Sequence, residues 1–322
     1  MKISVAMCTY NGERYLREQL DSIAKQTRLP DELVVSDDGS SDRTLKLIEE
    51  FASSSPFSVR ISVNHKNLGT TRNFEKAIGS CGGELIALCD QDDIWHIKKL
   101  ELVEAVLSSA ASVGLVMSDA ELVDAASRSR GRSLWQGVGF DSRMRKRVAE
   151  GKALEVFVTH HVVTGATMAF RSAFRDLISP IPTEGALAHD GWIALMIAAV
   201  ADICFIEEPL IKYREHPAQQ MGARRRSTVE SVIRAQRTDR NNYLLQASQF
   251  QQAYERLPAS NGNSSGKRVR SIVREKIEHL HARAMMPSQR LSRVPLVLRE
   301  TLNLHYHRYS RGLFSAAKDL LV

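Results

Sequence analysis

The sequence predicts an α/β fold in which helices flank a mostly parallel central sheet, followed by a helical C-terminal extension. Over the first 120 residues, short apolar runs alternate with amphipathic segments, the pattern of a parallel sheet wrapped by helices. Acidic and polar clusters follow several of these runs. Beyond residue 223 the periodicity becomes helical and the composition basic. A length of 322 residues fits one large domain or two modest ones.

Each element of the first 120 residues follows from a local pattern. Leu16, Leu20 and Ile23 lie at helical spacing after the first apolar run. Ser41 or Asp42 is placed to cap the next helix, whose inner face is Leu45, Ile48 and Phe51. Strands are predicted at residues 3–7, 58–63 and 113–119. Residues 32–42 read as a strand that runs into a Gly/Ser turn, and residues 84–93 as a strand that ends in acids. Helices are predicted between them, which is the connection that a parallel sheet requires.

The second half of the chain is read from composition. The polar, basic run 127–147 predicts a surface loop or lid. Residues 168–178 read as a strand followed by a helix, and the apolar stretch 193–206 includes a buried helix. A linker is expected at 258–268, with helical pieces around 269–285 and 294–321. We therefore predict two domains, residues 1–222 and 223–322.

Charge divides the chain at the same point. Residues 223–322 hold 19 Lys and Arg against 7 Asp and Glu, a net charge of +12, which leaves −5 for residues 1–222. A basic region attracts phosphate, on nucleic acid or on an anionic membrane. Aromatic residues are too sparse among the charges for nucleic-acid binding. Two alternatives stay open for the basic region: a solvated helical surface, or peripheral contact with an anionic inner membrane leaflet. Residues 312–322 could likewise form either a terminal core helix or a short amphipathic membrane anchor.

Composition excludes several classes of protein. With 43% hydrophobic and 25% charged residues, the chain is neither disordered nor collagen-like. Its four cysteines show no CxxC spacing, which argues against a zinc ribbon or a disulfide framework and favours a reducing compartment. The N-terminal apolar run is too short for a secretory signal, and the longest apolar stretch is too short to span a bilayer. We expect a cytoplasmic protein.

Acidic residues gather where the predicted strands end. Asp37 and Asp38 follow the second strand, and Asp90, Asp92 and Asp93 follow the fourth. Ligands of open parallel sheets bind at the carboxyl ends of the strands, and adjacent acids repel one another unless a cation joins them. Asp92 and Asp93 are therefore candidates for holding Mn²⁺ or Mg²⁺ beside substrate phosphates; a solvated acidic turn is the alternative. The sequence contains neither GxGxxG nor GxxxxGK[ST], so neither a dinucleotide fold nor a P-loop ATPase is supported.

Four motifs, taken in order, resemble a known family. VAMCTYNGERYLREQLDSIAKQT, VVSDDGSSDRT, NLGTTRNF and LCDQDDIW are similar to segments of bacterial family-2 glycosyltransferases of the GT-A fold, most of all the rhamnosyltransferase-like members. The resemblance covers residues 2–110 and returns at HDGW (189–192) and LIKYREH (210–216). It implies a GT-A nucleotide-diphospho-sugar transferase fold, and a nucleotide-diphosphate sugar and a saccharide or lipid-linked acceptor as partners.

The resemblance also implies roles for individual residues. Thr9, Tyr10 and Asn11 match the loop that holds base and ribose, and Asp38 matches the acid that binds the base. Arg72 lies where a basic residue approaches the nucleotide. Asp92 matches the acid on the ribose side of the donor, and Asp93 the metal-binding acid, with Asp90 supporting the pair.

Two motifs near residue 200 complete the expected site. Asp190 resembles the family's catalytic base, although Asp at this position is equally suited to capping the helix that follows. His189 is expected to pack beside it or orient it. His216 matches a histidine near the diphosphate or the metal, with a functionless loop histidine as the alternative.

Three further residues are candidates for contacts around this site. Arg214 is a candidate phosphate contact, or a solvated loop arginine. Trp192 and Trp95 are candidates for an acceptor wall, although core packing is favoured for Trp95. Gly191 replaces an aromatic residue that relatives often carry there, and PAQQMGA after YREH departs from the usual Asn and Gly. We expect a wider acceptor pocket and altered loop closure.

The sequence therefore predicts an inverting glycosyltransferase in which Asp190 deprotonates an acceptor hydroxyl. Inversion is implied by the resemblance. The motifs are most similar to those of the rhamnosyltransferase-like members, so the resemblance implies rhamnose as the donor sugar. Two alternatives stay open: a sugar nucleotidyltransferase, and a non-catalytic module that binds sugar nucleotides within a polysaccharide assembly complex.

Overall fold

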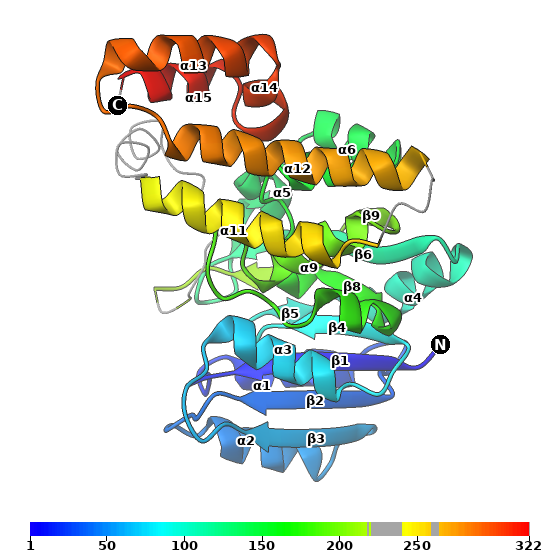
Figure 1. Cartoon of the computed structure of the whole chain (residues 1–322). Helices are drawn as coiled ribbons and strands as arrows, with labels where there is room; N and C mark the ends of the chain where they lie inside the picture. The colour runs from blue at the N-terminus through cyan, green and yellow to red at the C-terminus, as the bar shows by residue number, and fades with distance from the viewer. Residues whose placement is uncertain (218, 220–239, 259–263, 322) are drawn as a thin grey trace. The chain divides into compact units, whose positions relative to one another are not determined.

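A nine-stranded sheet organises the described N-terminal residues (Figure 1). The strands are β1 (Ile3–Thr9), β2 (Glu32–Asp37), β3 (Ser58–Val63), β4 (Leu85–Cys89), β5 (Ile94–Trp95), β6 (Val113–Val123), β7 (Ser129–Ser133), β8 (Met168–Arg171) and β9 (Asp202–Arg214). Their order is β3-β2-β1-β4-β8-β6-β9-β5, and β7 pairs with β6. The computed structural model describes residues 1–217, 219, 240–258 and 264–321.

Most strands run in one direction. The pairs β1–β2, β1–β4, β2–β3 and β6–β9 are parallel. Strand β8 is antiparallel to both of its neighbours, so β4 and β6 also point the same way. The carboxyl ends of β1, β2, β4, β6 and β9 therefore lie at one edge of the sheet, as the sequence predicts.

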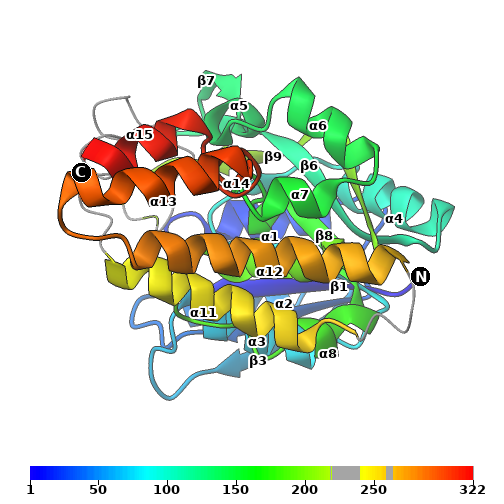
Figure 2. The same ribbon diagram turned by 45° about the horizontal axis from the view of Figure 1, so that its top comes forward.

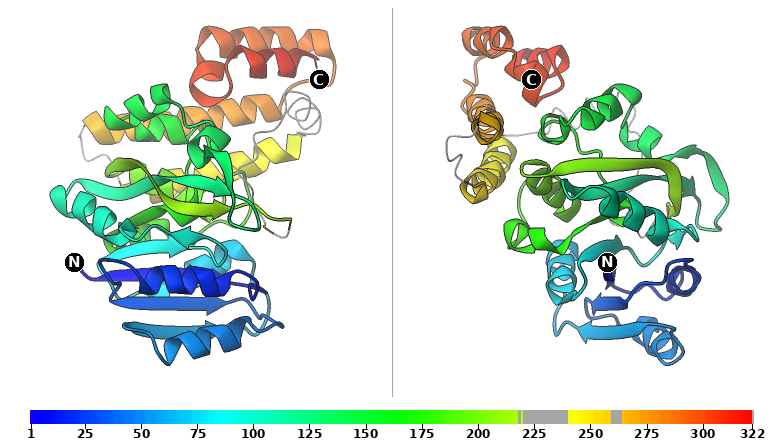
Figure 3. Two further views of the ribbon diagram at one scale, coloured as in Figure 1. Left: turned by 180° about the vertical axis from the view of Figure 1, so that it is seen from behind. Right: turned by 90° about the vertical axis from the view of Figure 1, so that its right-hand side faces the viewer.

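Helices cover both faces of this sheet (Figures 1 and 3). They are α1 (Leu16–Ala24), α2 (Thr44–Ala52), α3 (Thr70–Ser80), α4 (Lys99–Ser109), α5 (Leu134–Val138), α6 (Ser142–Ala149), α8 (Arg175–Ile178) and α9 (His189–Ala198). Alternate residues of β1, namely Ile3, Val5 and Met7, join one core cluster with the apolar faces of α1, α2 and α4. The predicted stripe of Leu16, Leu20 and Ile23 lies in this cluster. Both α3 and α9 cover the opposite face.

The loop or lid predicted at 127–147 was wrong. Strand β7 and helices α5 and α6 occupy this run. Its few apolar residues decide the outcome: Trp135 and Phe140 are buried, and both make edge-to-face ring contacts with Phe205 of β9. Ser133 caps α5 through a capping box, and Asp141 caps α6. The run was predicted to be a loop because most of its residues are polar, and so the two short capped helices were not recognised in the sequence.

A second unit is helical. It comprises Lys152–His161, Glu184–Ala188 and the described part of Arg225–Val322, whereas the first unit comprises Met1–Gly151, Val162–Thr183 and the described part of His189–Arg224. Its helices are α7 (Ala153–Phe157), α11 (Arg240–Arg256), α12 (Ser264–Ala284), α13 (Arg290–Leu302), α14 (His305–Tyr309) and α15 (Leu313–Leu321). Figure 2 shows α11 beside α12 and α13 beside α15. The boundary predicted at residue 222 and the cluster Arg224–Arg226 lie outside the described residues.

Two details of the helical unit differ from the sequence prediction. Helix α12 begins at Ser264, inside the linker expected at 258–268. The helical piece expected at 294–321 is three helices, because the chain turns at Leu304 (φ 60°) and Gly312 (φ 57°). Among the described residues, none of the helices combines the length and the apolar character needed to cross a membrane.

Candidate active site

The loop after β1 is fastened to the acidic loop after β4 by one side chain. Gln91 Oε1 accepts a hydrogen bond from the Tyr10 amide at 2.9 Å, and Gln91 Nε2 donates to the Tyr10 carbonyl at 3.0 Å. Gly12 leaves the space for this side chain, since a Cβ at position 12 would lie 2.2 Å from Gln91 Oε1. The two loops therefore hold a fixed relation to each other. The sequence analysis missed Gln91, although it lies within the DQDD motif.

The loop after β1 is also tied to the turn after β2. The buried carboxylate of Asp37 accepts hydrogen bonds from Thr9 Oγ1 at 2.7 Å and from the Ser40 amide at 2.8 Å. Asn11 adopts φ 47°, a left-handed conformation that Asn tolerates, and its Oδ1 accepts from the Ser41 amide at 2.9 Å. The side chains of Thr9 and Asn11 thus shape the loop, whereas Tyr10 is exposed.

Asp38 organises the third loop of this edge. Its Oδ1 accepts from Asn64 Nδ2 and from the Leu68 amide, both at 2.8 Å, and its Oδ2 accepts from the Gly69 amide at 2.9 Å. A carboxylate has about four acceptor positions, so Oδ2 retains capacity for one more donor. Arg72 lies one turn into α3, where it is partly exposed and pairs with Glu75.

Four acids from two distant parts of the chain, the loop after β4 and the start of α9, raise the pKa of one buried phenol. The pKa of Tyr213 is raised well above its usual value, first by burial and then by the charges of Asp93, Asp90, Asp92 and Asp190. Burial raises the pKa of Asp90 to about 7, and the charges of Asp92 and Asp190 add to the effect. The structure thus brings the DQDD acids and Asp190 into one neighbourhood. Asp38 and Asp90 both act on the buried Cys8 thiol: its pKa is raised first by burial and then by the charges of Asp90 and Asp38. Asp38 therefore lies near the same group of acids.

The Asp93 carboxylate has one satisfied oxygen and one unsatisfied oxygen. Oδ1 accepts from the Arg214 amide at 3.0 Å. Oδ2 is buried and has no hydrogen-bond partner among the described residues. The pKa of Asp93 is raised, first by burial and then by the charges of Asp92 and Asp90. A buried, unpaired carboxylate oxygen is costly unless a proton or a cation binds it.

Lys99 supplies the positive charge behind these acids. Its side chain is fully buried, and its Nζ lies 3.8 Å from the centre of the Trp95 ring. Burial lowers its pKa to about 7, against the opposing effect of Cys89, Asp93 and Asp90. The sequence analysis missed Lys99, which is one of two adjacent lysines; only its position four residues before the buried Val103, on the same helix face, distinguishes it.

Asp190 lies in the first turn of α9, with its carboxylate held by main-chain groups. Oδ2 accepts from the Gly165 amide at 3.1 Å, and Oδ1 from the Gly191 amide at 2.7 Å. The neighbouring His189 stacks on Phe74 with ring centres 4.2 Å apart, and burial lowers its pKa. Its two ring nitrogens are buried with no hydrogen-bond partner among the described residues. His189 thus packs beside Asp190.

His216 contacts Asp92. The His216 Nε2 and Asp92 Oδ2 atoms are 2.7 Å apart, and the imidazole lies 4.8 Å from the Tyr15 ring, centre to centre. The motif LIKYREH is therefore brought to the DQDD acids by the end of β9, which pairs with β5 directly after those acids.

Two sequence assignments are corrected by burial, and a third residue follows the alternative that the sequence favoured. Arg214 is not a phosphate contact: its guanidinium is buried and donates to the Asp92 carbonyl, the Ala125 carbonyl, Ser127 Oγ and Glu18 Oε2. Trp192 does not line an acceptor pocket, because it is fully buried and its Nε1 donates to the Ile178 carbonyl at 2.7 Å. Trp95 belongs to the core cluster, the alternative that the sequence favoured.

Comparison with known proteins places the chain in a family. The sequence profile of Glycosyl transferase family 2 matches residues 4–178. An uncharacterised glycosyltransferase of Nostoc sp. is 27% identical over 240 residues, which are 73% of this chain and 71% of that protein. The dTDP-rhamnosyl transferase RfbG of Shigella flexneri is 42% identical over 100 residues, 30% of this chain and 34% of that protein.

Solved structures share the fold. The structure of Staphylococcus aureus TarS 1–349 in complex with UDP-GlcNAc has a TM-score of 0.59 at 20% identity, covering 99% of this chain and 88% of that one. The mannosyltransferase PcManGT of Pyrobaculum calidifontis, in complex with GDP-Man and Mn²⁺, has a TM-score of 0.54 at 20% identity, covering 99% and 85%. The fold is thus GT-A, as the motifs imply.

The profile match spans more than half of the chain and decides against the nucleotidyltransferase and the non-catalytic module that the sequence left open. The chain belongs to glycosyl transferase family 2, and it is an enzyme that transfers a sugar from a nucleotide-sugar donor.

Proposed function

We propose that the chain is a metal-assisted inverting glycosyltransferase, which moves a sugar from a nucleotide-diphosphate donor to a hydroxyl of a saccharide or lipid-linked acceptor in cell-surface polysaccharide synthesis. The observation that carries the proposal is the neighbourhood of Tyr213, where the charges of Asp90, Asp92, Asp93 and Asp190 all act. Acids gathered in this way suit a reaction that needs both a cation and a base.

The nucleotide is proposed to bind along the loops after β1 and β2. Asp38 Oδ2 retains capacity for one donor, which a base N–H would supply. Tyr10 presents an exposed ring to the same loops, while Thr9 and Asn11 fix their shape. Arg72, partly exposed on α3, is the proposed basic contact to the nucleotide.

The acids after β4 fit a divalent cation. Asp93 Oδ2 is buried without a hydrogen-bond partner among the described residues, which is the state of a carboxylate oxygen whose ligand is a metal. We propose that Asp93 holds Mn²⁺ or Mg²⁺, with His216 beside it and Asp92 toward the ribose; PcManGT was solved with Mn²⁺. When bound, the ion would neutralise charge that develops on the departing diphosphate.

Asp190 is the proposed general base. The amides of Gly165 and Gly191 orient its carboxylate in the first turn of α9, and a carboxylate held in this way can accept a proton. Asp190 would take the proton from the acceptor hydroxyl as this oxygen attacks the anomeric carbon, and the bond from that carbon to the diphosphate would break on the opposite side. His189 packs against Phe74 and supports the start of the helix.

Substitution of Asp190 tests this assignment. Asp190→Asn keeps the size of the side chain but removes the base, so we expect the transfer rate to fall by about 10²- to 10⁴-fold while donor binding is retained. Asp202→Asn, at the exposed first residue of β9, is the matched control. Unchanged transfer by Asp190→Asn, with donor binding intact, would refute the proposal.

The donor sugar is proposed to be rhamnose on thymidine diphosphate. The support is the rhamnosyltransferase-like motifs together with the 42% identity to RfbG over 100 residues. A thermal-shift panel of nucleotide sugars with Mn²⁺ tests this, since a ligand that binds only the folded protein raises the unfolding midpoint. We expect dTDP-rhamnose to raise it most; a larger shift with a UDP-sugar or GDP-sugar would replace this donor.

Peripheral contact with the cytoplasmic face of an anionic membrane is proposed through the helical unit. Leu291, Val294, Leu298 and Leu302 form one stripe along α13, and Leu291 and Leu302 are 87% and 80% exposed. Leu313, Phe314 and Leu321 of α15 are also exposed. The unit's net positive charge complements anionic headgroups, and apolar side chains flanked by basic ones suit the membrane interface.

Cosedimentation with vesicles tests the membrane contact. We expect binding to phosphatidylglycerol vesicles, weaker binding to phosphatidylcholine vesicles, and loss of binding in the double variant Leu298→Ser/Leu302→Ser. Leu245→Ser, on the exposed side of α11, serves as the control and is expected to bind like the wild type. Equal binding by the double variant would show that α13 makes no such contact.

A further inference from the structure

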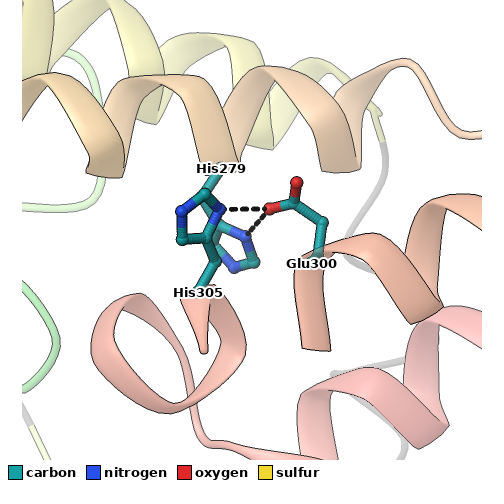
Figure 4. Close-up of side chains that lie close together, drawn as sticks. All are labelled: His279, Glu300 and His305. Atoms are coloured by element: carbon teal, nitrogen blue, oxygen red, sulfur yellow. Dashed lines mark hydrogen bonds and ion pairs between the residues drawn. The ribbon is translucent and has the colours of Figure 1, made fainter. Parts of the chain in front are cut away.

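Three side chains from three helices of the helical unit converge on one point (Figure 4). His279 comes from α12, Glu300 from α13 and His305 from α14. Glu300 Oε2 lies 2.7 Å from His279 Nδ1 and 3.0 Å from His305 Nδ1. One ligand atom from each residue lies within 4.8 Å of the other two. His279 and Glu300 are buried, and His305 is partly buried.

The donor set is that of a transition-metal site. Two imidazole nitrogens and one carboxylate oxygen bind Zn²⁺ at sites that keep a fourth position for water. Mg²⁺ and Ca²⁺ prefer oxygen donors alone, so this set differs in kind from the acids after β4. Tetrahedral Zn²⁺ places neighbouring donor atoms about 3.3 Å apart. Each nitrogen would therefore move a few tenths of an ångström away from Glu300 Oε2, and the two nitrogens, which lie within 4.8 Å of each other, would close to about 3.3 Å.

The surroundings of the cluster hold its rings in place. His279 Nε2 lies 2.9 Å from Ser310 Oγ, and metal-bound histidines commonly give their second nitrogen such an oxygen partner. Two buried cations, Arg283 and Lys276, act on His279. Arg283 contacts Ser310 Oγ at 3.0 Å, but two hydrogen bonds to Asp319, at 2.7 and 2.8 Å, balance its charge. Lys276 Nζ donates to the Tyr309 carbonyl at 2.7 Å.

The backbone before His305 also serves the cluster. Leu304 adopts φ 60° and ψ 14°, a left-handed conformation that is unfavourable for a side chain such as Leu. This turn ends α13 and starts α14, so that His305 faces Glu300 five residues earlier. An unfavourable turn that aims a metal-binding side chain is consistent with strain held at a functional site.

We propose that His279, Glu300 and His305 bind one Zn²⁺ ion, with water in the fourth position, and that this ion clips α12, α13 and α14 together. The site is separate from the proposed catalytic cation and structural in role. On binding, the Nδ1 proton of each neutral imidazole moves to Nε2, where Ser310 Oγ accepts that of His279. No redox step is involved, and the carboxylate stays ionised.

Zinc content and stability of the full chain test the proposal. Chelator-treated protein is titrated with Zn²⁺. Elemental mass spectrometry then measures the number of Zn²⁺ ions bound per chain, and thermal denaturation measures the unfolding midpoint. His305→Ala removes one partly exposed ligand, and His307→Ala removes an exposed histidine from the same helix as a matched control. We expect His305→Ala to bind one Zn²⁺ fewer and to lose most of the Zn²⁺-induced shift, whereas His307→Ala matches the wild type.

Two further measurements make the result decisive. Co²⁺ at a tetrahedral site gives strong visible absorption, which we expect in the wild type and not in His305→Ala. Glu300→Gln preserves the size of the side chain, and we expect it too to lose one Zn²⁺; it replaces His305→Ala if that variant does not fold. Equal zinc content and equal midpoint shifts in all variants would overturn the proposal, and would mean that the three side chains form only a hydrogen-bonded network.

Discussion

Lys99 Nζ donates a 2.6 Å hydrogen bond to the carbonyl oxygen of Ala166, from a side chain that is fully buried. Ala166 adjoins Gly165, whose amide holds Asp190, and Lys99 is also the cation that lowers the pKa of Asp90 and Asp93. One lysine thus links the acids after β4 to the turn that positions the proposed base.

Replacement of this lysine should disturb both sides of the site. Lys99→Met keeps the apolar stem but leaves Asp90 and Asp93 without their buried counter-charge, at a cost of roughly 2 kcal/mol or a Tm lower by about 5 °C. We also expect weaker donor binding in the presence of Mn²⁺. Scanning calorimetry measures the Tm, and titration calorimetry measures the affinity for the donor. Lys98→Met, at the exposed neighbour, is the control, and identical behaviour of the two variants would contradict this account.

Gly12→Ala should uncouple two loops without unfolding the protein. The added methyl would meet Gln91 Oε1 at 2.2 Å, so the flexible end of Gln91 must leave and its two hydrogen bonds to Tyr10 are lost. We expect a loss of about 1–2 kcal/mol and a higher KM for the donor with a smaller change in kcat. Steady-state kinetics measures KM and kcat, and chemical denaturation measures the free energy of unfolding. At Gly79 a methyl group meets no atom within 4 Å, so Gly79→Ala should leave KM unchanged.

Arg214→Lys should impair stability and activity together. Lysine keeps the charge but cannot reach Glu18, Ser127 and the Asp92 carbonyl at once, and it loses the planar stacking of the guanidinium on the Tyr15 ring at 4.5 Å. We expect the Tm to fall by several degrees and the KM for the donor to rise. Arg128→Lys, at an arginine that is 80% exposed, is the comparison. Wild-type kinetics in Arg214→Lys would show that these contacts of Arg214, at the end of β9, are dispensable for donor binding.

The helical unit should become more stable as the pH rises from 7 toward 10. Burial lowers the pKa of Lys276 from 10.5 to about 7, while the unfolded chain keeps the ordinary value. Between these values the unfolded state binds the additional proton, so the free energy of unfolding increases with pH. Hydrogen exchange of α12 at pH 7 and pH 9, corrected for the intrinsic rate, measures this change. Lys276→Met should flatten the dependence; the same slope in both proteins would assign it to other groups.

Local pattern and strand order were sufficient to predict much of the site. Short apolar runs and helical spacing predicted the strands and helices of the first 120 residues, and the shared direction of β1, β2 and β4 implied that the acids after them lie at one edge. Asp190, whose place followed from the family resemblance rather than from strand order, lies near the same DQDD acids. The run 127–147 could not be predicted, because its fold depends on burying Trp135 and Phe140 against Phe205, far along the chain.

By itself, the sequence determined the family, the order of the elements and the edge at which chemistry-bearing residues gather, since these depend on local periodicity and on motifs a few residues long. Only the tertiary structure decided which polar side chains are available to a ligand. In the sequence, Arg214 and Lys99 both look like cations that could meet a ligand. In the structure both are buried: Arg214 holds neighbouring segments together through hydrogen bonds, and Lys99 balances the charge of the nearby acids. The cluster of His279, Glu300 and His305 was equally hidden, because burial and convergence arise only when three helices pack and water is excluded.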